Sequence, residues 1–379
     1  MLQRALRQLL MRRVDDPEVV DAILRHASFR DRAVLEKALS GCFFAPFVHQ
    51  EMVEGARFEA RARWSRVALG NMSLDWVREA ALAACDRELR EGVFESLLDE
   101  VRRTVVRATV RLALGSDELV PLATEAVRDI DRSIKMIGRA ELPIRLQLAA
   151  ALRHTLAAPD GWQLASYLGV SRDEALALAL DERVDHMASV FLATGTIQVS
   201  DTVTHALIAL AQHPAAAVAS DEAVVLETLR CFPVNASITR QPKALVEVGA
   251  QRFAAGEPIT FVPERLHGAA TFDPLAPHAA GWSFGAGPRA CPARKLSLAL
   301  ASAVLGAYRA LGVEVEPRYV HRRSLAFDVR ARIGPGGAPR PTPKARRMAT
   351  WARYAAVAAE SYPRAFVRGF PELVRVIAS

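Results

Sequence analysis

A cysteine near residue 290 is surrounded by residue types that could hold a large, flat ligand against a sulfur atom. Residues 282–294 read WSFGAGPRACPAR, so glycine and proline crowd the stretch before Cys291. Gly285 and Gly287 have no side chain, which lets the backbone come close to such a ligand. Arg289 adds a fixed positive charge two residues before the sulfur. This combination predicts a tight loop that presents a thiolate.

The residues after this cysteine predict a helix. Residues 295–311 are rich in alanine and leucine, which favours a buried helix. A thiolate at the N-terminus of a helix gains from the helix dipole and from backbone N–H groups, so the ionised sulfur is favoured there. The alternative is a structural cysteine buried in a turn, which is the usual role of a free cysteine.

The loop resembles the haem-binding loop of cytochrome P-450, whose pattern is Phe-x-x-Gly-x-Arg/His-x-Cys-x-Gly. Phe284, Gly287, Arg289 and Cys291 match this pattern, and Ala293 stands in place of its last glycine. The resemblance implies that the cysteine is the axial ligand of the iron in haem b.

Three further segments resemble the same family in the same order along the chain. Glu227 and Arg230 fit its Glu-x-x-Arg motif, a buried ion pair that supports the haem loop. Arg240 stands where the family has an arginine at a haem propionate. Arg57 and Arg61 share a helix face, as in a family helix that binds a propionate, although the family has His or Trp at the first position; an arginine face in solvent is the alternative. The residues implied at the cofactor are Arg57, Arg61, Gly195, Arg240, Phe284, Gly285 and Arg289.

Residues 186–212 are apolar and continuous, and predict a long helix through the middle of the domain. This stretch resembles the family's distal helix, in which an acid and a threonine follow a glycine by two and three residues and hold the water chain that delivers protons. Gly195 fits that pattern. Ile197 and Gln198 stand where the acid and the threonine belong, so the pair is absent in the expected register.

Other polar residues surround this gap on the distal helix. Asp201 and Thr202 form an acid–alcohol pair one turn later, about 6 Å along the helix, and whether they replace the missing pair is open at this stage. An apolar loop at 41–48 is either a wall of the pocket or ordinary core. The residues implied in the distal pocket are Thr194, Thr196, Ile197 and Gln198, and those implied at the substrate are Ala193, Val234, Asn235, Ala326 and Phe327.

The resemblance implies a haem-thiolate oxidase or monooxygenase that acts on a small or medium-sized organic molecule in a bacterial biosynthetic pathway. Ferredoxin and its reductase are the implied electron donors, and a polar group of the substrate would complete proton delivery because Ile197 cannot. One alternative is an atypical haem-thiolate enzyme that uses peroxide or nitric oxide, or that catalyses a rearrangement or dehydration. A second alternative is a catalytically silent recruitment module with the same fold.

The composition is that of an ordinary soluble globular protein, with 379 residues, of which 51% are hydrophobic and 24% charged. Its four cysteines lie far apart and do not resemble a disulfide framework, which favours the cytoplasm. No apolar run is long enough to predict a transmembrane segment. The net charge of +7 comes from dispersed arginines without a nucleic-acid-binding signature, so a basic face for an acidic redox partner is the preferred interpretation.

The expected fold is mainly α with small β-sheets, and resembles the cytochrome P-450 triangular prism of helices around haem over residues 1–333. A Pro/Gly linker at 334–343 and a helical extension at 344–379 follow. The extension is expected to pack on the main domain where the family's usual N-terminal start is missing, with membrane-surface binding as the alternative. Helices are expected at 19–25, 55–68, 75–89, 93–114, 119–137, 142–157, 186–212, 223–231 and 295–311, and a hairpin from 245–248 and 253–259.

Overall fold

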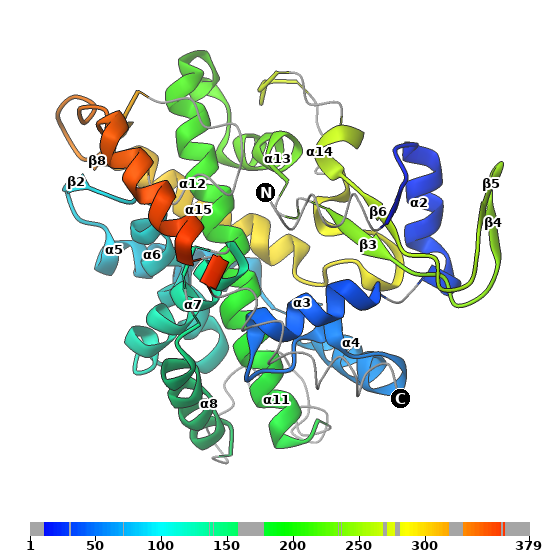
Figure 1. Cartoon of the computed structure of the whole chain (residues 1–379). Coiled ribbons are helices and arrows are strands. Elements are labelled where there is room, and N and C mark those ends of the chain that lie inside the picture. Colours follow the sequence, from blue (N-terminus) through cyan, green and yellow to red (C-terminus); the bar gives the residue numbers. More distant parts are fainter. Residues whose placement is uncertain are drawn as a thin grey trace.

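The structure is a computed structural model. The chain is predominantly helical and has a few short strands (Figure 1). It describes residues 11–29, 32–70, 72–135, 137–138, 140–157, 178–233, 235, 237–267, 271–276, 281–317, 329–357 and 359–360. The fold is mainly α with small β-sheets, as the sequence predicts. Among the described helices, none is long and apolar enough to cross a membrane.

The helices begin and end close to the positions that the sequence predicts. Asp16 caps the first of them, because its side chain accepts hydrogen bonds from the N–H groups of Glu18 and Val19. The helices of the first half are α2 (Pro17–Arg25), α3 (Val34–Phe44), α4 (Gly55–Gly70), α5 (Leu74–Glu88), α6 (Leu97–Leu114), α7 (Val120–Lys135) and α8 (Leu142–Ala157). Those of the second half are α11 (Leu180–His186), α12 (Thr196–Gln212), α13 (Asp221–Cys231), α14 (Pro263–Leu266) and α15 (Arg294–Leu311), with a further helix at 344–357.

One continuous helical rod runs through the molecule and is drawn in green in Figure 1. It consists of α11, the segment η3 (Met187–Gly195) and α12. The sequence predicts this rod but not its centre, because η3 is a π-helix. A π-helical turn holds one more residue than an α-helical turn and often marks a functional site. The rod packs against α6, α13 and α15.

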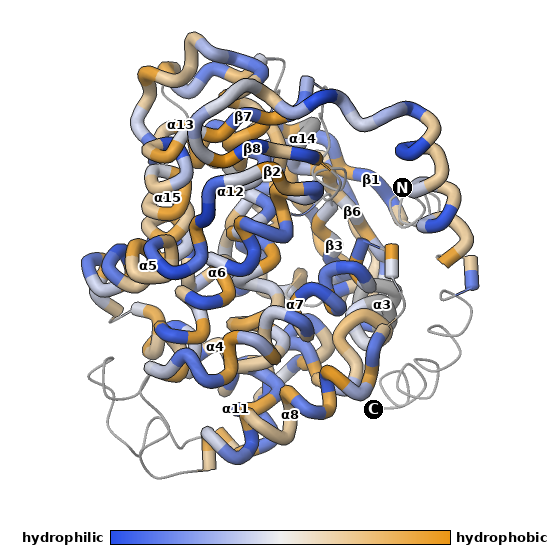
Figure 2. Tube along the Cα trace, turned by 90° about the vertical axis from the view of Figure 1, so that its left-hand side faces the viewer, coloured by the Kyte–Doolittle hydropathy of each residue, from blue (hydrophilic) through white to orange (hydrophobic). Residues whose placement is uncertain are grey.

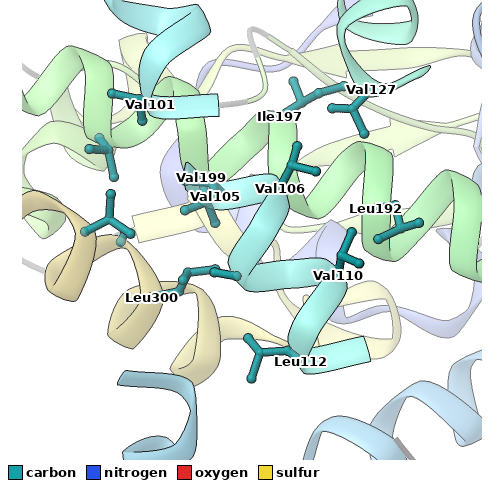
Figure 3. Close-up of a cluster of buried hydrophobic side chains, with 14 of the residues drawn as sticks. Val101, Val105, Val106, Val110, Leu112, Val127, Leu192, Ile197, Val199 and Leu300 are labelled. Carbon is teal, nitrogen blue, oxygen red and sulfur yellow. The ribbon is translucent and has the colours of Figure 1, made fainter. Parts of the chain in front are cut away.

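Apolar side chains gather where α6, α12 and α15 meet. Val105, Val199 and Leu300 belong to one buried cluster that these three helices share (Figure 3). Hydrophobic and hydrophilic residues alternate along the surrounding helices (Figure 2), which is typical of helices with one face in a core. This core fixes the N-terminal half of α15 against the rod.

The strands form three small sheets. One has the order β1–β6–β3, from Arg12–Arg13, Ile259–Phe261 and Ile238–Arg240; another has the order β2–β8–β7, from Gly92–Phe94, Ala331–Ile333 and Val313–Val315. The third pairs β4 (Val246–Val248) with β5 (Gln251–Phe253). The expected hairpin is therefore tighter than predicted, and residues 259–261 pair with β3 instead.

The helix expected at 93–114 begins later than predicted. Residues 92–94 form β2, which pairs with β8, and α6 starts only at Leu97. The reason is the cap at Ser96, whose hydroxyl accepts a hydrogen bond from the N–H of Asp99. The strand partner lies more than two hundred residues away, so local sequence could not indicate it.

The described part of the C-terminal extension lies beside β2 and β7. The N–H of Thr342 donates to Glu316 Oε2 at 2.7 Å, and Arg346 Nη2 lies 3.2 Å from Glu95 Oε2. The helix at 344–357 is drawn in orange and red on the left of Figure 1, whereas α2 and the β1–β6–β3 sheet lie on the right. Residues 344–357 therefore lie away from α2 in this view, and most of the rest of the extension falls outside the described residues.

Candidate functional site

Cys291 closes a compact loop just before α15. Its N–H donates to the carbonyl of Phe284 at 2.8 Å, and the N–H of Ala290 donates to Gly287 at 3.0 Å. Gly287 has a φ of +64°, and a Cβ atom there would lie 2.2 Å from the carbonyl oxygen of Leu24. Glycine is thus required at 287 both by the left-handed backbone and by the approach of α2. The loop binds back onto α2 and leaves the cysteine at the start of α15.

The Cys291 thiol is half-buried and holds its proton more tightly than an ordinary cysteine. Burial raises its pKa, and a hydrogen bond from the N–H of Ala293 lowers that pKa in part. The free thiol is therefore protonated at neutral pH, whereas a metal cation would replace the proton and be bound by the thiolate. The N–H of Ala293 would then donate to an anionic sulfur.

Glu227 and Arg230 form the buried ion pair that the sequence predicts. Arg230 is bidentate, with Nε 2.7 Å from Glu227 Oε2 and Nη2 2.7 Å from Oε1. The carboxylate also accepts the N–H of Asp273 at 2.7 Å, and Arg230 Nη2 donates to the carbonyl of Thr271 at 2.7 Å. Backbone groups of 271–273 thus complete the cluster.

His267 connects this ion pair to the cysteine loop, and sequence reasoning missed it. The N–H of Trp282 donates to His267 Nε2 at 3.1 Å, so the ring proton must be on Nδ1, which donates to the carbonyl of Arg230 at 3.1 Å. The two rings are stacked with centroids 5.7 Å apart. No sequence motif marks this residue, because its partners lie 15 and 37 residues away.

Two predicted arginines lie near the loop and the sheet. Arg240 is 2% exposed at the end of β3, and its Nη1 donates to the carbonyl of Thr239 at 2.8 Å. The Arg289 guanidinium lies over the ring of Phe58 in α4, 3.9 Å from its centroid. A buried guanidinium favours a carboxylate partner, so both side chains suit a ligand that carries carboxylates.

Arg57 and Arg61 both bind Glu182 at the start of the rod. Arg61 is fully buried and also donates to the carbonyl of Val48 and to Asp185. These contacts give the two arginines a structural role, in which they join α4 to α11. A propionate would have to compete with Glu182 for them.

A stripe of partly accessible residues follows one face of the central rod. Between His186 and Ala209, every residue outside this stripe is buried. The spacing by one and three residues places the members on a single face. We call this set the accessible stripe; it consists of Val190, Phe191, Thr194, Gly195 and Gln198. It includes three of the predicted residues, namely Thr194, Gly195 and Gln198.

The other predicted distal residues lie off this stripe. Ile197 is 6% exposed and belongs to the same core cluster as Val106 and Val127 (Figure 3). Thr196 and Ala193 are fully buried. The position expected for the acid is therefore an ordinary core position in this chain.

Asp201 is held in a buried network of charges rather than beside the stripe. Lys135 Nζ lies 2.8 Å from Asp201 Oδ1 and 2.9 Å from Asp131 Oδ1, and Asp131 also binds Arg102. The hydroxyl of Thr202 donates to the carbonyl of Gln198 at 2.8 Å. The network joins α7 to α12, so the Asp201 carboxylate already has a cationic partner and serves packing.

The expected substrate residues fall mostly outside the described part of the chain. The structure does not describe Val234, Ala326 or Phe327, and Asn235 is exposed. The apolar stretch expected as a loop at 41–48 begins inside α3, which ends at Phe44. Its phenylalanines Phe43, Phe44 and Phe47 are at most 8% exposed and belong to the core cluster.

The residues present fit a haem-thiolate centre. The sulfur of Cys291 is a soft ligand with a hydrogen-bond donor beside it. Arg240 and Arg289 supply charge for carboxylates, and the accessible stripe supplies a partly exposed face of the rod. In the described part of the chain, no group of three or more His, Cys, Asp or Glu residues is arranged to hold a metal ion by itself.

Solved structures with the same fold are cytochromes P450. CalO2 aligns with a TM-score of 0.66 at 19% identity, over 86% of this chain and 91% of its own. CYP164A2 of Mycobacterium smegmatis aligns with a TM-score of 0.64 at 17% identity, over 88% and 94%. P450BioI, solved with an acyl carrier protein that carries hexadec-9Z-enoic acid, aligns with a TM-score of 0.63 at 14% identity, over 85% and 91%. The chain therefore has the cytochrome P450 fold.

No model of a protein family and no curated protein sequence matches this chain.

Proposed function

We propose that this protein is a haem-thiolate oxidoreductase, with haem b bound through Cys291, that oxidises a small or medium-sized organic molecule. The observation that supports this most is the pairing of a glycine-shaped cysteine loop with an accessible stripe on the neighbouring helical rod. A sulfur ligand on one element and a partly exposed helix face on another suit a flat cofactor with a substrate beside it.

Different residues of the chain would contact the iron, contact the propionates and support the cysteine loop. Cys291 would hold the iron as a thiolate, and the N–H of Ala293 would donate to that sulfur. Arg240 and Arg289 bind the propionates, while Glu227 and Arg230 hold the loop in place. When bound, haem supplies oxidative chemistry, and a thiolate ligand favours cleavage of an O–O bond.

Proton delivery is the step for which this chain lacks the usual groups. Ile197 is a core residue, and Asp201 is engaged by Lys135. We infer that a polar group on the substrate completes the delivery, in a monooxygenation supplied with electrons by ferredoxin and its reductase. The basic net charge of +7 suits an acidic redox partner, and the four cysteines are thiols, which suits the cytoplasm. We place the reaction in a biosynthetic pathway.

A second candidate function follows from the same apolar distal position. An enzyme that uses peroxide, or that catalyses a rearrangement, needs no delivery of two protons to dioxygen. Turnover with peroxide but not with ferredoxin, its reductase and dioxygen would favour this candidate over the monooxygenase.

The cofactor assignment is tested by the spectrum of the reduced, carbon-monoxide-bound protein. The Soret band should lie where thiolate-ligated haem absorbs, and Cys291→Ser should abolish that band. Cys42→Ser is the matched control, because Cys42 is also half-buried and lies in α3, outside the loop. A wild-type protein that takes up no haem would rule out this function and favour the recruitment module.

A further inference from the structure

A hydrogen-bond chain connects the loop before α4 to the accessible stripe. The N–H of Glu51 donates to His49 Nδ1 at 3.1 Å, and His49 Nε2 lies 3.0 Å from the hydroxyl oxygen of Thr194. The hydroxyl of Thr194 in turn donates to the carbonyl of Ser189 at 2.7 Å. Thr194 is thus fixed by a residue far away in the sequence and by its own helix.

These contacts determine which ring nitrogen of His49 carries the proton. Because Nδ1 accepts from the Glu51 N–H, a neutral ring must carry its hydrogen on Nε2, and this hydrogen points to Thr194. The ring is 5% exposed and stacks on Phe44 with centroids 4.1 Å apart. Burial, together with the nearby charges of Arg32 and Arg61, lowers the pKa of His49 to about 4, although the Glu51 carboxylate opposes this shift. The ring therefore stays neutral at physiological pH.

The same contacts determine what Thr194 can still offer to a ligand. A hydroxyl group has one hydrogen to donate and two lone pairs that accept. The hydrogen is used by Ser189, and one lone pair is used by the N–H of His49. One lone pair is left on a residue of the accessible stripe, so Thr194 can accept a hydrogen bond there but cannot donate one.

We propose that Thr194, oriented by His49, is the specificity-determining acceptor of a substrate site at the accessible stripe, and that it selects substrates that carry a hydroxyl, amine or N–H group. This inference rests on the proposed function and narrows its substrate class. Thr194 is the substrate-contacting residue, and His49 is a positioning residue that prevents the hydroxyl from turning. An ether or an unprotonated tertiary amine, which has no hydrogen to donate, would leave the lone pair of Thr194 without a partner.

The test compares ligands that differ only by one hydrogen-bond donor. The probe pairs are phenol and anisole, aniline and N,N-dimethylaniline, and indole and 1-methylindole. Dissociation constants are measured from the Soret shift of the haem-loaded protein, and binding is measured separately by saturation-transfer NMR, which needs no haem signal. In the wild type, at least one donor ligand should bind about tenfold more tightly than its methylated partner.

The variants distinguish an acceptor from a structural threonine. Thr194→Val should bind both ligands of a pair about equally, and Thr194→Ser should keep the wild-type preference for the donor ligand. His49→Gln should keep the preference because an amide can still donate, whereas His49→Phe should reduce it because the freed hydroxyl can turn and donate to an ether. Thr196→Val is the matched control; its hydroxyl is fully buried and off the stripe, so the preference should not change. Thr194→Ala replaces the valine variant if the latter does not fold.

Two failures have different meanings. A haem-loaded Thr194→Val protein that keeps the wild-type preference would overturn this inference alone, as would a wild type that shows no preference for any pair. A protein that takes up no haem would overturn the proposed function, while the NMR measurement would still decide whether Thr194 is an acceptor.

Discussion

Three histidines are held neutral inside the protein, and each is placed by its hydrogen bonds. Nδ1 of His49 and Nε2 of His267 accept backbone N–H groups, while Nε2 of His186 lies 2.6 Å from the hydroxyl of Ser65. That hydroxyl donates to the carbonyl of Arg61, so the ring of His186 must be the donor. Burial lowers the pKa of all three, to about 4 for His49 and about 3 for His186.

These pKa values predict a loss of stability in acid. A folded state with a lowered histidine pKa binds fewer protons than the unfolded chain, so unfolding takes up protons and the free energy of unfolding falls as the pH drops below about 6.5. Between pH 7 and pH 5 the loss should be about 2 kcal/mol for each of His49 and His186. Urea denaturation at the two pH values measures it.

The control for this prediction is His49→Gln, which removes one titrating group and keeps an N–H donor. Its free energy of unfolding should fall by about 2 kcal/mol less than that of the wild type over the same pH interval. An equal fall in both proteins would mean that His49 titrates normally in the folded state.

Residues with a strong chemical signature could be predicted from the sequence, and residues placed by distant partners could not. Cys291 and the Glu227–Arg230 pair belong to short motifs, so their neighbours are encoded nearby. His49 and His267 act through residues of other elements, and nothing in the local sequence distinguishes them from ordinary buried histidines. The buried ion pairs of Arg61 depend in the same way on Glu182, which is more than one hundred residues away.

At the scale of elements, helix boundaries followed from local signals, and the exceptions follow from tertiary contacts. Asp16 and Ser96 cap their helices with their own side chains. The strand at 92–94 depends on β8, and the π-helical η3 lies within a stretch that reads as continuous helix. Gly195 costs helix stability, which is a local sign of irregularity, but it cannot distinguish a kink from a π-helical turn.

The contact between α2 and the cysteine loop predicts a selective effect of two glycine substitutions. Gly287 and Gly249 both have positive φ angles, so alanine at either costs about 1 kcal/mol in backbone strain. Gly287 alone would also drive a Cβ into the carbonyl of Leu24, whereas nothing lies within 4 Å of a Cβ at Gly249. Gly287→Ala should therefore separate the loop from α2.

The expected results differ between stability and cofactor content. Gly249→Ala should lower the free energy of unfolding by about 1 kcal/mol and leave haem content unchanged. Gly287→Ala should lower the free energy of unfolding by several times that amount. It should also lower the haem bound per chain, measured as the ratio of Soret to protein absorbance. Equal haem content in the two variants would contradict the role of α2 in supporting the loop.

At the scale of the whole molecule, the linker before the C-terminal helix is attached to a buried carboxylate of the main domain. Glu316 is 2% exposed, and its carboxylate accepts the N–H groups of Arg330 at 3.3 Å and Thr342 at 2.7 Å. The contact of the helix with Glu95 is an ion pair whose two side chains are about 60% exposed, and such pairs contribute about 0–1 kcal/mol. We propose that the linker contact at Glu316 contributes more to stability than the helix ion pair at Glu95.

Two truncations of the full chain separate the linker from the helix. A chain that ends at residue 343 keeps Thr342 and loses the ion pair at Glu95, which contributes about 0–1 kcal/mol of unfolding free energy. A chain that ends at residue 334 also lacks the hydrogen bond from the Thr342 N–H to the buried Glu316 carboxylate. Its free energy of unfolding should be lower by a further amount of about 1.5–3 kcal/mol, because hydrogen bonds to charged groups are stronger than those between neutral groups. Glu316→Gln in the full chain should reproduce part of this loss, since it weakens the same bond without shortening the chain. Urea denaturation curves of the three variants are compared with that of the full chain. A chain ending at 334 that unfolds at the same urea concentration as the full chain would show that the extension is not packed on the main domain.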